Sequence, residues 1–127
     1  MAALLYFSRN PNPRLALAVA RHLGATVMIE GEIGQRRVLD TILAGRSAAE
    51  VIPRLKPGTL VISTGDRDDV MLATALAASN GIELAGLLLT HHSFISPRIE
   101  RFGSRGFHSG LPVLRTDGDS FETAARI

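Results

Sequence analysis

The chain has 127 residues, of which 46% are hydrophobic and 20% are charged; this balance excludes a disordered chain and predicts a single domain spanning residues 1–127. Its 14 Lys and Arg residues exceed its 12 Asp and Glu residues by only two and form no basic run interleaved with aromatics, so we expect no nucleic-acid partner. The absence of cysteine excludes disulfides, thiolate metal ligands and a thiol nucleophile.

The beginning of the chain predicts a strand, a helix and a second strand. Leu4–Phe7 is an apolar run that suits a strand. After a proline-rich turn, an amphipathic helix is indicated by the spacing of Leu15, Val19 and Leu23. Thr26–Glu30 is the second strand, and we therefore expect a β-α-β unit.

The next part of the chain is less regular. Val38–Leu43 is rich in residues that favour strands, and it is either a strand or an extended crossing segment. Ser47, with Glu50 three residues later, has the pattern of a capping box and predicts a short helix over Ala48–Leu55. Pro53 falls inside this helix, near its first turn, where a proline costs least.

The central stretch, Lys56–Thr74, predicts a strand, a tight turn and a helix. Thr59–Ile62 is a short apolar run that suits a buried parallel strand. The helix is expected over Asp68–Ser79, and Asp66 or a neighbouring turn residue is expected to cap its free N–H groups. Arg67 is a cation where the helix dipole disfavours one, so we expect it to have a partner or a function.

The remaining chain continues the alternation of strands and helices. Leu84–Thr90 and Gly110–Leu114 predict two more strands. A helix begins at Ser96–Pro97, and a terminal helix is expected over Ser120–Ile127. Together these elements predict an α/β fold, a three-layer sandwich with a mainly parallel sheet of about five strands.

Ligands of such a sheet bind outside the carboxyl ends of its strands, which places a candidate site in three loops. These loops are Ser63–Asp69, Thr90–Pro97 and Arg115–Asp119. They hold the candidate ligand-binding residues Gly65, Asp66, Arg67, Asp69, Thr90, His91, His92, Asp117 and Asp119.

These residues support two interpretations. In the first, they form a pocket for a small anionic ligand, with Arg67 and helix N-terminal amides as its positive elements. In the second, Asp66 and Asp119 cap helices and Arg67 pairs with a carboxylate across the loop. For each aspartate taken alone, capping is the commoner use.

No motif in the sequence predicts catalysis or a cofactor. The adjacent His91 and His92, even with His108 or Asp117, lack the spacing of a strong metal motif, so neither a metal ion nor another cofactor is expected. The sequence holds no phosphate loop, nucleophile elbow or histidine-glutamate zinc motif. A triad of Ser63, His91 and Asp117 is not selected by spacing, so no catalytic residue is predicted.

The central stretch also carries a family resemblance. Gly65-Asp66-Arg67 with Asp69, followed by Leu87-Leu88-Leu89-Thr90, resembles the DRTGG domain, most closely the version inside long bacterial phosphate acetyltransferases. The resemblance covers roughly residues 13–127. It extends to Leu23-Gly24-Ala25, Glu30-Gly31-Glu32-Ile33, Arg36-Arg37-Val38, Arg46-Ser47, Asn80-Gly81, Gly110-Leu111-Pro112-Val113 and Phe121-Glu122-Thr123.

One position departs from the family. Where the family has Thr-Gly-Gly, this chain has Thr90-His91-His92. The family uses its glycines for close backbone approach or for positive φ. Any ligand contact that the family makes through this backbone is therefore expected to be changed here.

The resemblance implies a non-catalytic regulatory and oligomerisation domain related to phosphate acetyltransferase, sensing a small anionic or nucleotide ligand. Long acetyltransferases place a phosphate-loop domain before this region and the acetyl-transfer domain after it. We therefore expect no enzyme activity from this chain alone, which is either a piece of such an enzyme or free-standing. The alternatives are a free-standing small-molecule binding protein and a small enzyme that uses the His91-His92 pair.

A role in assembly implies a homodimer. Its candidate surfaces are Val38–Leu43, if this strand lies at a sheet edge, and the preferred Phe94–Ile95 and Phe102–Phe107 region, where phenylalanine and arginine occur together. No apolar run reaches membrane-spanning length, so no membrane partner is expected and a cytoplasmic location is the default.

Overall fold

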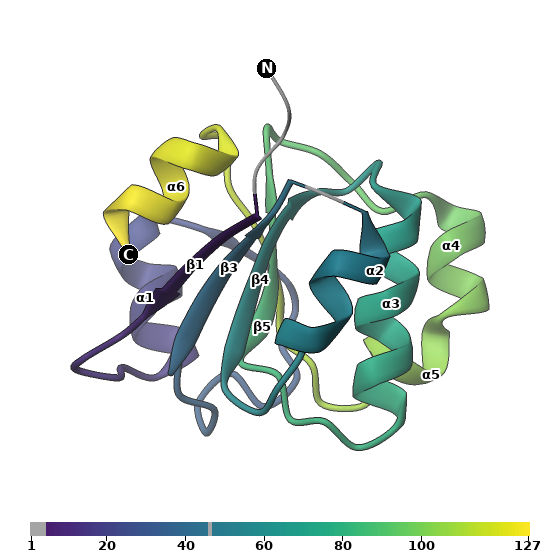
Figure 1. Cartoon of the computed structure of the whole chain (residues 1–127), viewed down its shortest axis with the longest axis horizontal. Helices are drawn as coiled ribbons and strands as arrows, with labels where there is room; N and C mark the ends of the chain where they lie inside the picture. The colour runs from purple at the N-terminus through teal and green to yellow at the C-terminus, as the bar shows by residue number, and fades with distance from the viewer. Residues whose placement is uncertain (1–4, 46) are drawn as a thin grey trace.

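The computed structural model describes residues 5–45 and 47–127, which form a mixed sheet covered by helices on both faces (Figure 1). Within these ranges the strands are β1 (Leu5–Arg9), β2 (Thr26–Ile29), β3 (Asp40–Ala44), β4 (Thr59–Thr64), β5 (Gly86–Thr90) and β6 (Val113–Arg115). The helices are α1 (Ala16–Leu23), α2 (Ala48–Val51) with the 3-10 turn η1 (Ile52–Arg54), α3 (Asp68–Ser79), α4 (Pro97–Phe102), α5 (Ser104–Phe107) and α6 (Ser120–Arg126). Leu4, where the first strand was expected to begin, lies outside the described residues.

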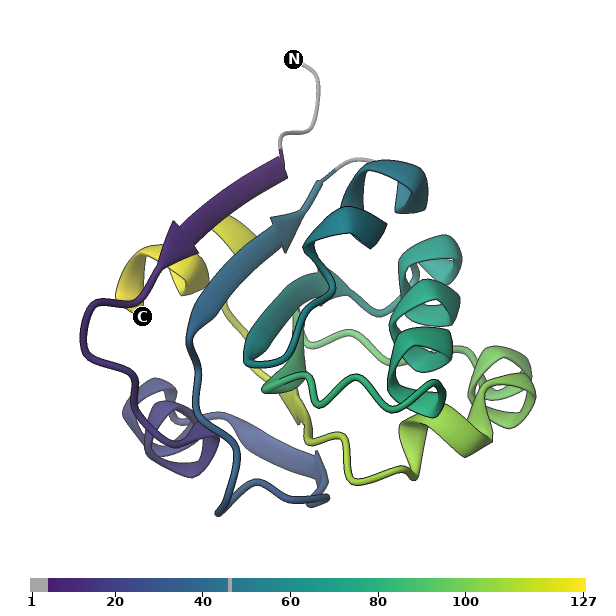
Figure 2. The same ribbon diagram turned by 60° about the horizontal axis from the view of Figure 1, so that its bottom comes forward.

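The sheet is mixed rather than mainly parallel. Its order is β1-β3-β4-β5-β6-β2, and the described residues form six strands rather than about five. The inner strands β3, β4, β5 and β6 are parallel to one another, whereas β1 and β2 pair antiparallel with β3 and β6 at the two edges. The α/β class and the three layers are confirmed, because helices cover both faces of the sheet (Figure 2).

One prediction about strand position is wrong, and the condition attached to a second is not met. β1 and β2 lie at opposite edges of the sheet, so the opening of the chain is not a β-α-β unit. The strand expected over Val38–Leu43 is β3, and it pairs with β1 on one side and β4 on the other. Because both of its hydrogen-bonding edges are occupied, β3 is not available as a dimer surface.

The core lies on both faces of the central strands. Side chains of β4 and β5 alternate between the faces, as expected of parallel strands covered on each side. On one face Val61, Leu87 and Leu89 pack with α2, α3 and α5. On the other face Leu60, Ile62 and Leu88 pack with α1. The apolar runs that predicted β4 and β5 are therefore apolar because neither face meets water.

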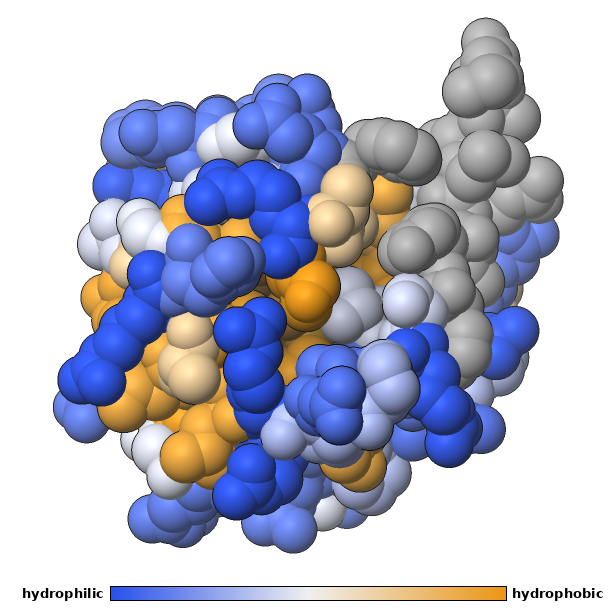
Figure 3. Space-filling view, turned by 90° about the vertical axis from the view of Figure 1, so that its left-hand side faces the viewer, coloured by the Kyte–Doolittle hydropathy of each residue, from blue (hydrophilic) through white to orange (hydrophobic). Residues whose placement is uncertain are grey.

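The face that carries α1 and α6 is seen in Figure 3, where hydrophobic surface is interspersed with hydrophilic residues. Partly buried apolar side chains frame the core on this side: Leu17, Ala25, Leu43, Ala124 and Ile127. Across the described ranges, no helix combines the length and the apolar character needed to cross a membrane.

The observed helix boundaries agree with the predicted ones for α3 but differ for α2. α3 spans Asp68–Ser79 as expected, and its C-terminal turn is closed by backbone bonds from Asn80. The helix expected over Ala48–Leu55 is α2 followed by η1, a tighter turn that contains Pro53, which has no N–H to donate. Ser47 makes no side-chain capping bond; the Ala48 N–H instead donates to Asp69 Oδ2 at 3.2 Å.

Candidate functional site

Three loops meet at the carboxyl ends of β4, β5 and β6, as the sheet rule predicted. We call them the first loop (residues 65–67), the second loop (residues 91–96) and the third loop (residues 116–119). The Gly65 N–H donates to Ser93 Oγ at 2.8 Å, and this hydroxyl donates to the Thr90 carbonyl at 2.5 Å. A Cβ on Gly65 would collide with the carbonyl of Phe94. The first loop therefore needs glycine in order to approach the second.

The second and third loops are joined through backbone bonds from the two histidines. The His91 N–H donates to the Gly118 carbonyl at 2.8 Å, and the His92 N–H donates to the Thr116 carbonyl at 3.0 Å. Both histidines adopt the left-handed conformation, with φ of 57° and 53°. A side chain in this region costs about 1–2 kcal/mol relative to the right-handed region, which accounts for the two glycines of the Thr-Gly-Gly pattern. Both positions therefore adopt a backbone conformation that favours glycine.

Replacing His91 by glycine is expected to raise the free energy of unfolding by about 0.5–1 kcal/mol. Relief of the left-handed strain exceeds the extra chain entropy that glycine brings to the unfolded state. The gain in the free energy of unfolding should be smaller for His92→Gly, because this variant also loses the contact between His92 and Asp117. Urea denaturation measures both variants, and His91→Ala, which keeps the strain, should show no gain. A loss of stability in His91→Gly would mean that its imidazole is structural.

An aromatic and cationic cluster lies at the junction of the loops. The Arg115 guanidinium stacks 4.2 Å from the centre of the Phe94 ring, and His92 meets this ring edge-on at 5.8 Å. His92 Nδ1 lies 2.6 Å from Asp117 Oδ1. Among the described residues, the buried Arg115 Nη1 has no hydrogen-bond partner, which is unusual for a guanidinium N–H. Phe94 remains 56% exposed, so the cluster presents ring surface to solvent.

Arg115 and Phe94 were missing from the predicted ligand-binding residues. Arg115 is the last residue of β6. Because ligands bind at the carboxyl ends of such strands, this position could have identified Arg115 as a candidate. Phe94 was assigned to a dimer surface instead. Only the fold shows that these two side chains, on different segments, stack on each other.

Arg67 fits the structural interpretation of the first loop. Its Nη1 donates to the Ala44 carbonyl at 3.1 Å, and its Nε lies 3.5 Å from Asp69 Oδ1. Asp69 also accepts the N–H that begins α2, so the pair ties the end of β3 and the start of α2 to α3. α3 begins without a side-chain cap, so the predicted capping by Asp66 is wrong.

The pKa of Asp69 reflects this role. Burial alone would raise the pKa of Asp69, but the Val70 and Ala48 N–H groups and the Arg67 guanidinium together lower it below its ordinary value of 3.8. Because the pKa of Asp69 is lower in the folded state than in the unfolded chain, Asp69 stabilises the fold at pH values above its ordinary pKa. This contribution is lost as the pH falls through the lowered pKa.

Thr90 and Asp119 also have structural roles. Asp119 Oδ1 accepts the Glu122 N–H at 2.6 Å, which confirms it as the cap of α6. Thr90 is buried, and its Oγ1 lies 2.5 Å from Ser120 Oγ at the start of α6. Gly65 and Thr90 are buried. The exposed members of the predicted set are Asp66, Asp69, His91, His92, Asp117 and Asp119. In the part of the chain that the structure describes, no group of three His, Cys, Asp or Glu side chains could hold a metal ion.

Comparisons with known proteins match both the sequence and the fold. The family described as the DRTGG domain matches residues 18–127. Phosphate acetyltransferase of Pseudomonas putida is 44% identical over 109 residues, which are 86% of this chain and 16% of that protein. Phosphate acetyltransferase of Escherichia coli is 38% identical over 109 residues, which are 86% of this chain and 15% of that protein. The chain thus spans about one-sixth of the length of these relatives.

The fold is also similar to that of a solved structure. It is the crystal structure of the CBS and DRTGG domains of the regulatory region of Clostridium perfringens pyrophosphatase, complexed with its activator diadenosine tetraphosphate. The TM-score is 0.65 at 17% sequence identity, and the match covers 87% of this chain and 47% of that one.

Proposed function

Because this chain belongs to the DRTGG domain family, we propose that it is a non-catalytic regulatory module that binds a nucleotide or another small anionic ligand at the three joined loops. The solved relative is a regulatory region in complex with a nucleotide activator, which supports a regulatory role. The proposal includes a homodimer and a cytoplasmic location. The acetyl-transfer activity of the relatives is not part of it, since the match covers only 15–16% of their length.

The observation that carries the proposal is the stack of Arg115 on Phe94 at the loop junction. Exposed rings and guanidinium planes are surfaces on which nucleobases stack, with about 1–3 kcal/mol for each base. The Phe94 ring is held by Arg115 on its face and by the edge of His92, so it is already positioned for a planar ligand. Arg115 Nη1 has no hydrogen-bond acceptor among the described residues, so part of the hydrogen-bonding capacity of this guanidinium is unused.

The charges around the junction shape what this site prefers. Aspartates outnumber arginines at the junction. The aspartates are Asp66, Asp68, Asp69, Asp117 and Asp119. Asp69 is already paired with Arg67, and Asp119 caps α6, yet the remaining carboxylates oppose a free polyphosphate. We therefore expect the ring of the ligand to supply most of the affinity. The phosphate is expected to contribute through Arg115 and to contribute less as the salt concentration rises.

Isothermal titration calorimetry with diadenosine tetraphosphate and with ATP tests the proposal. We expect saturable binding of at least one of them, with one site per chain. Phe94→Ala and Arg115→Ala should each weaken binding at least about tenfold, which corresponds to about 1.4 kcal/mol. Leu39→Ala is the control, because this apolar side chain is also exposed, at 42%, but precedes β3 at the end of the sheet opposite the loops. Heats that never saturate, or an unchanged affinity in Phe94→Ala, would contradict the proposed site.

A further inference from the structure

The outer side of α3 is apolar although it faces away from the sheet. The inner side of this helix packs Val70, Met71 and Ala75 into the core. On the outer side Leu72 is partly buried and Leu76 is 62% exposed. A helix that is apolar on both sides is typical of one that is covered on both sides. Within the described residues, no segment covers this outer side at Leu76.

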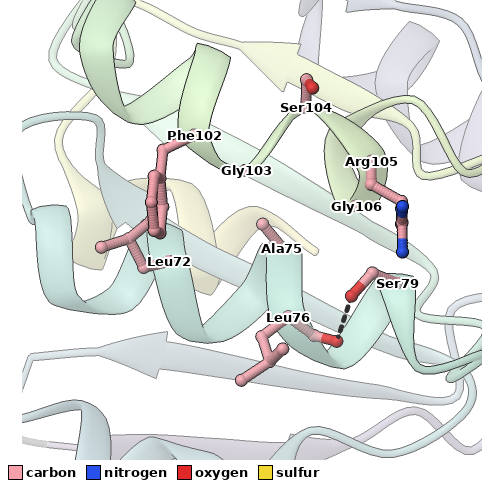
Figure 4. A pocket seen from close by; sticks show the side chains of 9 residues that line it. All are labelled: Leu72, Ala75, Leu76, Ser79, Phe102, Gly103, Ser104, Arg105 and Gly106. Carbon is pink, nitrogen blue, oxygen red and sulfur yellow. Dashed lines mark hydrogen bonds between the residues drawn. The ribbon is translucent and has the colours of Figure 1, made fainter.

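Beside α3 lies a hollow of about 510 Å³, which Figure 4 shows from close by. Its floor is made of small residues, Ala75, Gly103 and Gly106, where α5 approaches the backbone of α3. Phe102 stands at the rim, next to Leu72 in Figure 4, and is 86% exposed. A protruding ring and an apolar hollow thus lie on the same surface.

Charges mark the two ends of this surface. Asp68 and Asp69 begin α3, so its N-terminal end is acidic. At the other end of the helix, Figure 4 shows the Arg105 side chain extending toward Ser79. The acidic end of one α3 would therefore lie beside the basic end of a second α3 that runs antiparallel to it.

We propose that this surface is the homodimer interface, in which the α3 helices of two copies pack antiparallel about a two-fold axis. The inference rests on the assembly role in the proposed function. A two-fold interface brings the same surface of two copies together. The protrusion of each copy can therefore fill the hollow of the other copy. Phe102 of one copy enters the hollow of the second copy, and this is repeated by symmetry.

The register follows from the spacing along α3. With the axis at the level of residue 74, Leu72 of one copy lies opposite Leu76 of the other. Asp68 lies about 9 Å from the axis at a rise of about 1.5 Å per residue, which places it opposite the end of the second α3, where Arg105 extends. The same antiparallel arrangement therefore pairs apolar with apolar and acidic with basic residues.

The size of the interface indicates which other side chains take part. A stable dimer buries about 800 Å² on each partner, roughly an eighth of the 6589 Å² that this chain exposes. α3 alone is too narrow for this area. The interface therefore extends to Phe102 on α4 and to Ile52 on η1, which is 55% exposed and belongs to the same layer of helices.

This surface replaces the one expected from the sequence, which combined Phe94–Ile95 with Phe102–Phe107. Phe107 is fully buried in the core and cannot contact a partner. Phe94 is stacked with Arg115 at the loop junction. Only Phe102 of these phenylalanines belongs to the helical surface.

Sedimentation equilibrium of the full chain up to 100 µM tests the interface. The wild type should be a dimer, and Leu76→Glu and Phe102→Glu should each weaken dimerisation at least about 100-fold, since each places two charges in an apolar interface. Circular dichroism should show that both variants remain folded. Val27→Glu, a matched change at a side chain that is 42% exposed on the edge strand β2, should leave the dimer intact.

A charge exchange tests the antiparallel register. Asp68→Arg and Arg105→Glu should each weaken dimerisation about tenfold, because symmetry counts each pair twice, and the double variant should restore it. A wild-type dimer that survives both Leu76→Glu and Phe102→Glu would overturn this interface and leave the assembly role standing. A wild-type monomer at 100 µM would overturn both. Single charge variants that weaken the dimer without rescue in the double variant would overturn the register.

Discussion

Gly106→Ala is expected to lower the free energy of unfolding by about 3 kcal/mol, at the upper end of the range for overpacked cores. A Cβ at this position would overlap the carbonyl oxygen of Ala75, which belongs to the backbone of α3. α3 cannot move away, because its opposite side packs against the sheet, and Phe107 beside it is fully buried. The extra methyl group therefore separates α5 from α3.

Urea denaturation measures this effect, and Gly34→Ala is the matched control. A Cβ at Gly34 meets no atom within 4 Å, and its backbone has no positive φ. This control should change the free energy of unfolding by no more than about 0.5 kcal/mol. If Gly106→Ala cost as little as Gly34→Ala, the contact between α5 and α3 would not be the close one described here.

Arg36→Met is expected to cost about 3 kcal/mol. The Arg36 side chain is only 9% exposed, and its guanidinium bonds both the nearby Glu32 and the distant Leu84. Nε and Nη2 donate to Glu32 Oε1 at 3.0 and 2.6 Å, and Nη1 donates to the Leu84 carbonyl at 2.8 Å. Methionine keeps most of the apolar length but leaves the carbonyl of the buried Leu84 without this donor. Glu32 is 42% exposed and can be rehydrated, which keeps the cost at the lower end for a broken buried pair.

Arg37→Met is the control for this second prediction. Arg37 is the adjacent residue, but it is exposed, and its Nη1 donates a long 3.3 Å bond to the Pro13 carbonyl. Its replacement should change stability by about 0.5 kcal/mol or less in the same denaturation experiment. Equal losses in the two variants would show that Arg36 does not act as a buried link between the two segments.

The sequence predicted elements whose signals are local. α3 was predicted from first to last residue, because its acidic first turn, its continuous run of helix formers and the Asn80-Gly81 ending are all adjacent in the chain. β4 and β5 were recognisable as apolar runs. Asp119 was recognisable as a cap, because capping is a contact between residues three apart.

What the sequence could not predict depends on contacts between distant segments. Nothing in the residues of β1 and β2 indicates that they lie at opposite edges, since pairing partners are chosen by the whole sheet. Arg67 was identified as an unusual cation, but its bond to the Ala44 carbonyl is made with a different strand. The positive φ of His91 and His92 was indicated only by the glycines of the family pattern.

The central claim is that the three joined loops bind a small anionic ligand such as a nucleotide, and amide chemical shifts test it most directly. A ¹⁵N-labelled sample of the chain is titrated with diadenosine tetraphosphate. The account predicts saturable shift changes concentrated in residues 65–67, 91–96 and 116–119, including the amides of Gly65, His91 and His92. An unchanged spectrum, or changes confined to α3 and α5, would contradict the claim.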